Sequence, residues 1–197
     1  MDGDKGMKRT ILIVLTAVAI LLCWARQANA DGVTYTESGT ATGTIGTTAF
    51  SNALVTITFV GDTSNVSGSS GVFVNNVETA TATITISGIT YLFEDNMQVF
   101  VNQSGGIAGI EDLTTDDVLD TINSAVFSTY DLSTSIGPVT GPSVFNLEPG
   151  YNTSGGVLTF SMMSADSTFT ATVPEPSSLL LLGVGIAGLG MIRRRLV

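Results

Sequence analysis

The sequence predicts a mainly β protein: an antiparallel β-sandwich or jelly-roll-like body made of many short strands, with one short helix. The stretch from Asp31 to Val173 contains 26 threonines, and its Thr, Val, Ile and Phe residues suit a pleated, half-buried surface. Apolar and polar residues alternate in several segments, which is the period of a strand with one buried face. Clusters of Gly, Asn and Ser separate these segments and are typical of turns.

The alternation is clearest in residues 53–60 and 79–86, where apolar side chains occupy every second position. Ser87-Gly88 then predicts a two-residue hairpin turn, after which residues 89–93 and 97–101 complete a three-stranded antiparallel meander. Strands are also predicted at 157–163 and 168–173, with weaker patterns at 33–37, 72–77, 108–112 and 143–147; residues 61–71 and 137–142 are predicted to be loops.

One segment has helical spacing. Thr114 and Thr115 precede two acids in a pattern typical of a helix start, where carboxylates favour the helix dipole. Val118, Leu119 and Ile122 then fall on one helical face. We therefore expect a short helix near residues 115–126.

The charge distribution excludes several kinds of function for the body. Between Asp31 and Val173 there are fourteen Asp and Glu residues but no Lys, Arg, His, Cys or Trp. Nucleic-acid binding needs cations that replace phosphate counterions, and Ser-His-Asp or Cys-His catalysis needs a histidine base. Disulfides cannot form without cysteine, and the usual zinc ligands are missing. We expect no cofactor and no enzymatic activity.

The N-terminal segment is typical of a secretory signal peptide. Lys8 and Arg9 precede an apolar run at 11–22, and Ala28 and Ala30 form an A-x-A cleavage site for signal peptidase. A retained anchor is the alternative, but the run is short of the roughly 20 residues that a spanning helix needs. A lipoprotein would need a small residue before Cys23, where the chain has leucine. We expect residues 1–30 to be removed.

The C-terminal segment has three parts in a fixed order: the motif of Pro174, Glu175 and Pro176, an apolar run at 179–192, and a basic end. The prolines mark a boundary, because they cannot continue a strand or sit inside a helix. The run would span about 21 Å as a helix, short of the roughly 30 Å hydrocarbon core, so it predicts a marginal membrane anchor. The positive-inside rule keeps the basic end cytoplasmic and the body outside the inner membrane; its residues are Arg193, Arg194 and Arg195.

This segment resembles the PEP-CTERM sorting signal of bacterial exported proteins, which combines Pro-Glu-Pro, an apolar helix and an arginine cluster at the C-terminus. The resemblance implies recognition by an exosortase, removal of the helix, and delivery to the cell surface or extracellular matrix of bacteria that make exopolysaccharide and biofilm. A plain C-terminal anchor would look similar but has no need of Pro-Glu-Pro. The predicted organisation is therefore a signal peptide (1–30), an extracytoplasmic β-rich body (31–172) and a sorting and anchor segment (173–197).

We therefore expect an exported, non-enzymatic surface or matrix protein. Its expected partners are signal peptidase, an exosortase-type enzyme and the membrane, which serves as a transient anchor. Exopolysaccharide is a further candidate partner, whereas nucleic acid is not. Three alternatives stay open. Acids at 111–120 suit calcium, although they lack the spacing of a calcium loop. Tyrosines could contact exopolysaccharide, and two carboxylates across a cleft would suit a glycosidase. The acids and tyrosines concerned are Glu111, Asp112, Asp116, Asp117 and Asp120, and Tyr35, Tyr91, Tyr130 and Tyr151.

The T-x-T pattern at 79–85 resembles the threonine rows of flat ice-binding faces. A single strand does not make such a face. The interpretation requires that threonine rows on several neighbouring strands be aligned with one another.

Overall fold

A computed structural model of the chain describes residues 32–76, 81–113, 116–147 and 150–174. The predicted signal helix, the apolar C-terminal run and the site residues Ala28, Ala30, Glu175, Pro176 and Arg193, Arg194 and Arg195 lie outside these residues. Within the described ranges, no helix has both the length and the apolar character that crossing a bilayer requires.

Thirteen strands and two short helical turns make up the described part of the body. The helical turns are η2 (Thr63–Asn65) and α2 (Ser124–Phe127). The strands are β1 (Gly32–Ile45), β2 (Thr48–Asp62), β3 (Val66–Ser69), β4 (Val72–Asn75), β5 (Thr81–Ile86), β6 (Ile89–Leu92), β7 (Met97–Asn102), β8 (Ile107–Asp112), β9 (Asp116–Ile122), β10 (Ile136–Val144), β11 (Tyr151–Thr153), β12 (Gly156–Met163) and β13 (Asp166–Thr172).

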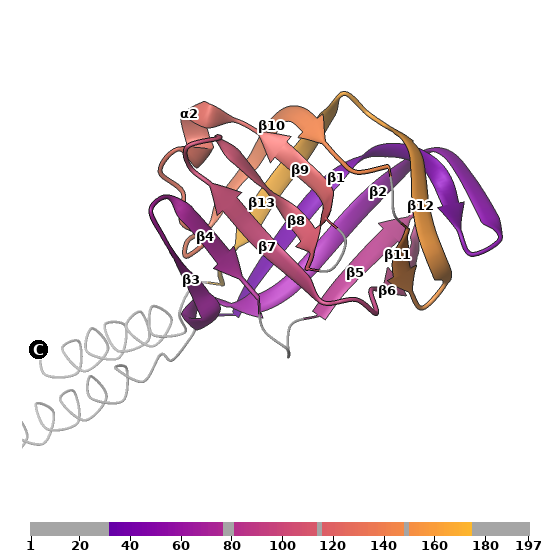
Figure 1. Cartoon of the computed structure of the whole chain (residues 1–197), viewed down its shortest axis with the longest axis horizontal. Coiled ribbons are helices and arrows are strands. Elements are labelled where there is room, and N and C mark those ends of the chain that lie inside the picture. The colour runs from indigo at the N-terminus through magenta and orange to yellow at the C-terminus, as the bar shows by residue number, and fades with distance from the viewer. Residues whose placement is uncertain (1–31, 77–80, 114–115, 148–149, 175–197) are drawn as a thin grey trace, which may run out of the picture. The chain divides into compact units, whose positions relative to one another are not determined.

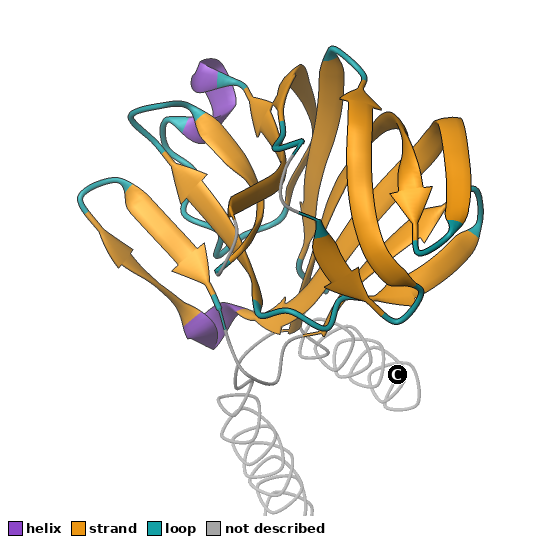
Figure 2. Cartoon of the chain, turned by 45° about the vertical axis from the view of Figure 1, so that its right-hand side comes forward, coloured by secondary structure: helices purple, strands orange, loops and turns teal. Residues whose placement is uncertain are grey.

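These strands form one antiparallel sheet that curls into a half-barrel (Figures 1 and 2). The strand order is β3-β4-β7-β8-β9-β10-β13-β1-β2-β5-β6, and β12 pairs with the second half of β1 and with β11. The prediction of a mainly β, antiparallel body is confirmed. The predicted sandwich of separate sheets is replaced by a continuous sheet, because β10 pairs with β13 on one side and with β9 on the other.

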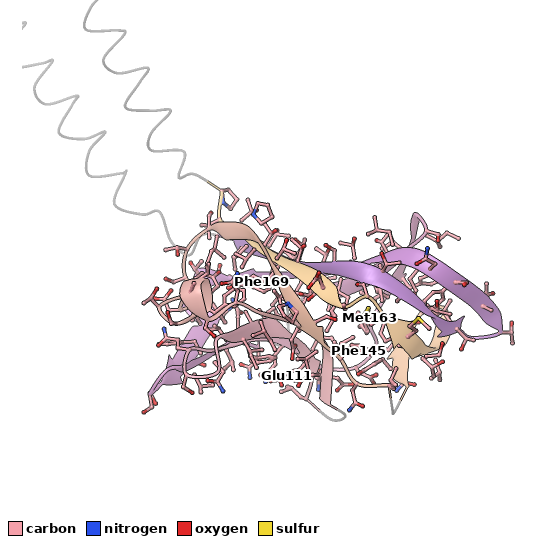
Figure 3. The ribbon with its side chains drawn as sticks, turned by 90° about the horizontal axis from the view of Figure 1, so that it is seen from above. Glu111, Phe145, Met163 and Phe169 are labelled. Carbon is pink, nitrogen blue, oxygen red and sulfur yellow. The ribbon has the colours of Figure 1, made fainter. Side chains whose placement is uncertain are left out.

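The core fills the space between the two curved halves of this sheet. Phe169 of β13 lies at its centre, with ring centroids 6.2 Å from Tyr35, 5.6 Å from Phe127 and 6.1 Å from Tyr130. The Tyr35 hydroxyl donates to the Leu132 carbonyl at 2.6 Å, which satisfies its polar end. Figure 3 shows the body from above, with Phe169 of β13 and Glu111 of β8 on opposite sides of it. The aromatic cluster therefore packs β1 and β13 against α2 and the loop that follows it.

Truncating the centre of this cluster is expected to be costly. Phe169→Ala should lower the free energy of unfolding by about 3–5 kcal/mol, because it removes buried ring surface and leaves a cavity. Denaturant unfolding measures the difference. Leu54→Ala is the control: Leu54 is 65% exposed, so the change should stay within about 0.5 kcal/mol. Equal effects at the two positions would contradict this assignment of the core.

Most predicted strands are present, but the predicted meander is wrong in its third strand. β5 and β6 pair as a hairpin, whereas β7 pairs with β4 and β8. The connection between β6 and β7 explains the difference. Phe93 forms a bridge with Thr153, and the Glu94 amide donates to the Asn152 carbonyl at 2.9 Å, so the chain leaves the hairpin edge and enters the other half of the sheet.

The helix predicted near 115–126 is also wrong over most of its length. Residues 116–122 form β9, and only Ser124–Phe127 is helical. The pairing of β8 with β9 shifts by one residue between Ile110 and Glu111, which leaves Val118 as an extra residue. Neighbouring side chains at 118 and 119 are therefore both buried, and this imitates helical spacing. Thr114 and Thr115 lie outside the described residues.

Two segments predicted to be loops are partly strand. Residues 61–71 contain the end of β2, the turn η2 and the strand β3, which pairs with β4. Asp62 starts η2 by accepting from the Ser64 amide at 2.7 Å. Residues 137–142 belong to β10. Pro138 is tolerated there because it lies in the register irregularity between Ile136 and Val139, and Pro142 is the last residue of the pairing with β13.

Candidate functional site

An open groove of about 500 Å³ lies where the β2-β5-β6 end of the sheet approaches β7. Its floor is apolar and includes the buried side chains of Phe59, Phe93 and Met97. Leu92 and Leu113 also line it, and they are 46% and 51% exposed. Large aliphatic side chains left exposed beside an apolar floor are typical of a surface that binds a ligand or partner.

The polar side of the groove carries two asparagines and one acid. Asn76 donates from its amide nitrogen to the Gln98 side-chain oxygen at 3.0 Å. Asp95 accepts from the backbone amide of Asn152 at 2.6 Å and from the Asn152 side chain at 2.9 Å. Asn96 completes this polar lining. Amides without any cation favour an uncharged, hydrogen-bonding ligand over an anionic one.

A second cluster of polar groups lies inside the half-barrel, around Glu37 of β1. One Glu37 carboxylate oxygen accepts from the Thr121 hydroxyl, and the other is buried without a hydrogen-bond partner. Thr121 and Ser167 share a hydroxyl contact at 2.7 Å, and Ser167 donates to the Asp120 carbonyl at 2.8 Å. Burial raises the pKa of Glu37 to about 8, against the lowering effect of its hydroxyl partners.

Asp120 is the second buried acid of this cluster, with 1% of its surface exposed. Burial, followed by repulsion from Asp117, Glu37 and Glu111, raises its pKa to about 10. One of its carboxylate oxygens lies where Gly109, its partner on β8, has no side chain. At neutral pH both Glu37 and Asp120 therefore hold protons, which reduces the charge inside the body.

The five acids considered as a calcium site lie on two neighbouring strands. In the register of β8 and β9, Glu111 pairs with Asp117 and Asp112 pairs with Asp116. Asp120 pairs with Gly109, two residues before Glu111 on β8. Sequence proximity and strand pairing thus bring them to one part of the sheet. Even so, the described residues contain no group of three acids, histidines or cysteines arranged to hold a metal ion.

Sequence reasoning missed the burial of Glu37, although a signal was present. Val33, Tyr35 and Glu37 alternate with Thr34 and Thr36 along β1, which places the carboxyl on the core face. An acid in phase with buried apolar residues predicts a protonated or hydrogen-bonded side chain. The groove had no comparable signal, because it joins segments that are distant in sequence and meet only in the curled sheet.

Only the first residue of the predicted sorting motif is described, and it lies directly after the last strand. The Val173 amide donates to the Ser135 hydroxyl at 2.9 Å, which fixes the end of β13 to the loop before β10. Pro174 follows and is exposed. The last strand thus ends just before the motif begins, and the first residue of the motif is accessible.

The comparison with protein families matches the chain over residues 172–195, to the PEP-CTERM protein-sorting motif. This range includes Pro174, Glu175 and Pro176, the apolar run, and the arginine cluster in the order the sequence predicted. No curated protein and no solved structure is significantly similar to the chain. The C-terminal segment of this protein is therefore a PEP-CTERM sorting motif, which implies export and membrane-associated sorting by an exosortase.

Proposed function

We propose that the chain is a non-enzymatic protein of the bacterial cell surface or extracellular matrix, exported by its signal peptide and then processed at its C-terminus. The observation that carries the proposal is the PEP-CTERM motif at 172–195, which follows β13 directly. In this scheme Pro174, Glu175 and Pro176 are a substrate for another enzyme. The apolar run holds the body transiently at the inner membrane until the exosortase removes it.

The composition of the body supports a passive role. The body contains no histidine and no cysteine, so it cannot form a Ser-His-Asp triad or a Cys-His pair. A carboxylate-dependent glycosidase would need two acids about 5 to 9 Å apart across a cleft. Asp95 is the one acid among the described residues that line the groove, and both oxygens of its carboxylate accept hydrogen bonds from Asn152. The described lining therefore does not supply the pair of acids that a glycosidase needs.

The sorting step can be tested by cell fractionation in exosortase-positive cells. Changing Pro174, Glu175 and Pro176 to alanine together should leave the protein in the inner membrane fraction, because the anchor is retained when the processing motif is lost. The wild type should reach the surface or medium. Immunoblotting of the fractions against the body measures the distribution.

The matched control changes two residues just before the motif, Thr168 and Thr170, to serine, which keeps the strand and its hydroxyls. This variant should distribute like the wild type. If the alanine variant also reached the surface, the proposed role of the motif would be wrong.

A second candidate function, binding of a neutral exopolysaccharide, is favoured by the groove between β5-β6 and β7. Leu113→Asp should weaken such binding at least tenfold, because a carboxylate beside the apolar floor would have to lose water. Calorimetry with the producing strain's own polysaccharide measures the affinity. Leu54→Asp, on an exposed site away from the groove, is the control. Binding that is unchanged in Leu113→Asp would remove the groove as the binding site.

A further inference from the structure

The convex outer face of the sheet carries a regular two-dimensional array of hydroxyl side chains. The first row crosses four paired strands, with Thr170 on β13, Thr36 on β1, Thr58 on β2 and Thr83 on β5. The second row runs parallel to it two residues away along every strand. Its members are Thr168, Ser38, Thr56 and Thr85.

The eight residues of these two rows, which we call the hydroxyl array, face away from the core. Their neighbours along each strand, such as Tyr35, Ile57 and Ile84, are fully buried, whereas every member of the array is half-buried. The strands that carry them lie side by side in the curled sheet (Figure 1). This alignment across neighbouring strands is the condition that the T-x-T pattern at 79–85 alone could not meet.

The array has a repeating geometry that the backbone imposes. Neighbouring strands lie about 4.7–4.9 Å apart, and residues two apart on a strand are separated by about 6.6–6.8 Å. Threonine is stiff at χ1, so its hydroxyl and methyl groups occupy defined positions. The hydroxyl groups at both ends of the second row are held in place by hydrogen bonds to threonines of the next strand. The distance between hydroxyl oxygens is 2.8 Å for Thr85 and Thr90, and 2.9 Å for Thr168 and Thr140.

The array is uncharged on a body that is otherwise acidic. Neither row contains a charged residue. Glu37 lies between Thr36 and Ser38 on β1, but its side chain is buried on the core face, and the other acids of these strands, Asp62 on β2 and Asp166 on β13, stand at or next to the strand ends. An uncharged surface does not orient water around ions, and it excludes partners that bind through charge. Neither row contains an aromatic residue, so the array lacks the flat rings on which sugars could rest.

We propose that the hydroxyl array binds the surface of ice. Ice is an uncharged solid that presents hydrogen-bonding groups at fixed spacings, and a rigid grid of hydroxyl and methyl groups can hold water in a matching order. Strand twist rotates neighbouring strands by roughly 20–25°, which limits planar contact to a few adjacent strands. For this reason the contact is assigned to the two rows on β13, β1, β2 and β5 rather than to the whole sheet.

An ice-affinity experiment tests the proposal with the protein as exported, purified from expressing cells. Ice is grown slowly from a dilute solution, and the protein concentration in the ice is compared with that in the remaining liquid. The wild type is expected to be enriched in the ice, while serum albumin is excluded. Thr58→Lys and Thr36→Lys should each reduce the enrichment at least tenfold, because a long charged side chain interrupts the grid.

Two further variants keep the result interpretable. Thr47→Lys adds the same charge to the exposed turn between β1 and β2, outside the array, and should leave the enrichment unchanged. Thr58→Val retains the shape of threonine and replaces its hydroxyl with a methyl group. The melting temperatures of all variants show which of them fold. Exclusion of the wild type from ice would overturn the proposal. Equal enrichment of folded Thr58→Lys and Thr47→Lys, or retention of the wild type by insoluble neutral polysaccharide but not by ice, would overturn it as well.

Discussion

Raising the pH is expected to destabilise the folded body by several kcal/mol, which is the reverse of ordinary acid unfolding. The cause is Glu37, whose pKa is raised by burial from 4.5 to about 8, and Asp120, whose pKa is raised from 3.8 to about 10. Below pH 4.5 Glu37 is protonated in both the folded and the unfolded chain. Between 4.5 and about 8 the unfolded chain releases this proton and the folded chain keeps it. Unfolding therefore becomes more favourable as the pH rises through this range.

The magnitude follows from the size of the shift. One pKa unit corresponds to about 1.4 kcal/mol, so the Glu37 shift alone is worth about 5 kcal/mol across its window. Asp120 acts in the same direction up to about pH 10. The total stability of a domain is about 5–15 kcal/mol, so the melting temperature should fall markedly between about pH 5 and pH 9.

Glu37→Gln separates this effect from general repulsion among the acids. Glutamine stays uncharged, so the variant should lose the part of the pH dependence that comes from Glu37, while the part from Asp120 remains, and it should melt at a higher temperature than the wild type near pH 9. Glu94→Gln removes a carboxylate from an exposed position and is the control. A Glu37→Gln variant that follows the wild-type pH profile would refute the assignment of a buried, protonated Glu37.

Gly141→Ala is expected to destabilise the fold strongly, because the structure has no room for a Cβ at this position. Gly141 lies in β10, two residues before this strand changes from pairing with β13 to pairing with β9. A Cβ at this position would come within 1.9 Å of the Ile122 carbonyl oxygen. Because that atom belongs to the backbone of β9, it cannot move without breaking the contact between the two halves of the sheet.

We expect Gly141→Ala to lower the free energy of unfolding by more than about 3 kcal/mol, the range of severe overpacking. Thermal unfolding and the yield of folded protein measure the loss. Gly105→Ala is the matched control, since the nearest atoms to its Cβ would be 3.5 Å away, at ordinary contact distance. Similar melting temperatures for the two variants would show that β9 and β10 do not meet as described.

Local pattern predicted the strands well where one face is buried and the other carries threonine. β2, β5 and β13 keep this alternation along most of their length, because each has one face on the core and one on the hydroxyl array. The same pattern did not predict β9 as a strand. This strand is paired on both sides, it contains a bulge, and its residues 118–121 are all buried, so its period of two is lost.

The arrangement of strands could not be predicted, because it depends on contacts between residues that are distant in sequence. β1 pairs with β2, β12 and β13. β7 pairs with β4, although the hairpin of β5 and β6 separates these two strands in the sequence. The groove, the burial of Asp120 and the alignment of the threonine rows all depend on these pairings. The sorting motif needed none of them, since its recognition rests on a contiguous segment at the C-terminus.

The charge distribution fits the proposed processing. All seven cations lie outside residues 31–173, so removal of residues 1–30 and of the arginine end leaves a body with fourteen acids and no cation. We expect such a body to repel anionic surfaces. Protonation of Glu37 and Asp120 reduces its internal charge.

The intact mass of the protein recovered from the surface of exosortase-positive cells tests the central claim most directly. The predicted form begins at Asp31 and lacks the apolar run and the arginines at 193–195. Cells without the exosortase should instead contain a form that begins at Asp31, keeps Val197 and stays in the inner membrane. Recovery of this unprocessed form from the inner membrane of exosortase-positive cells, with none at the surface, would contradict the account.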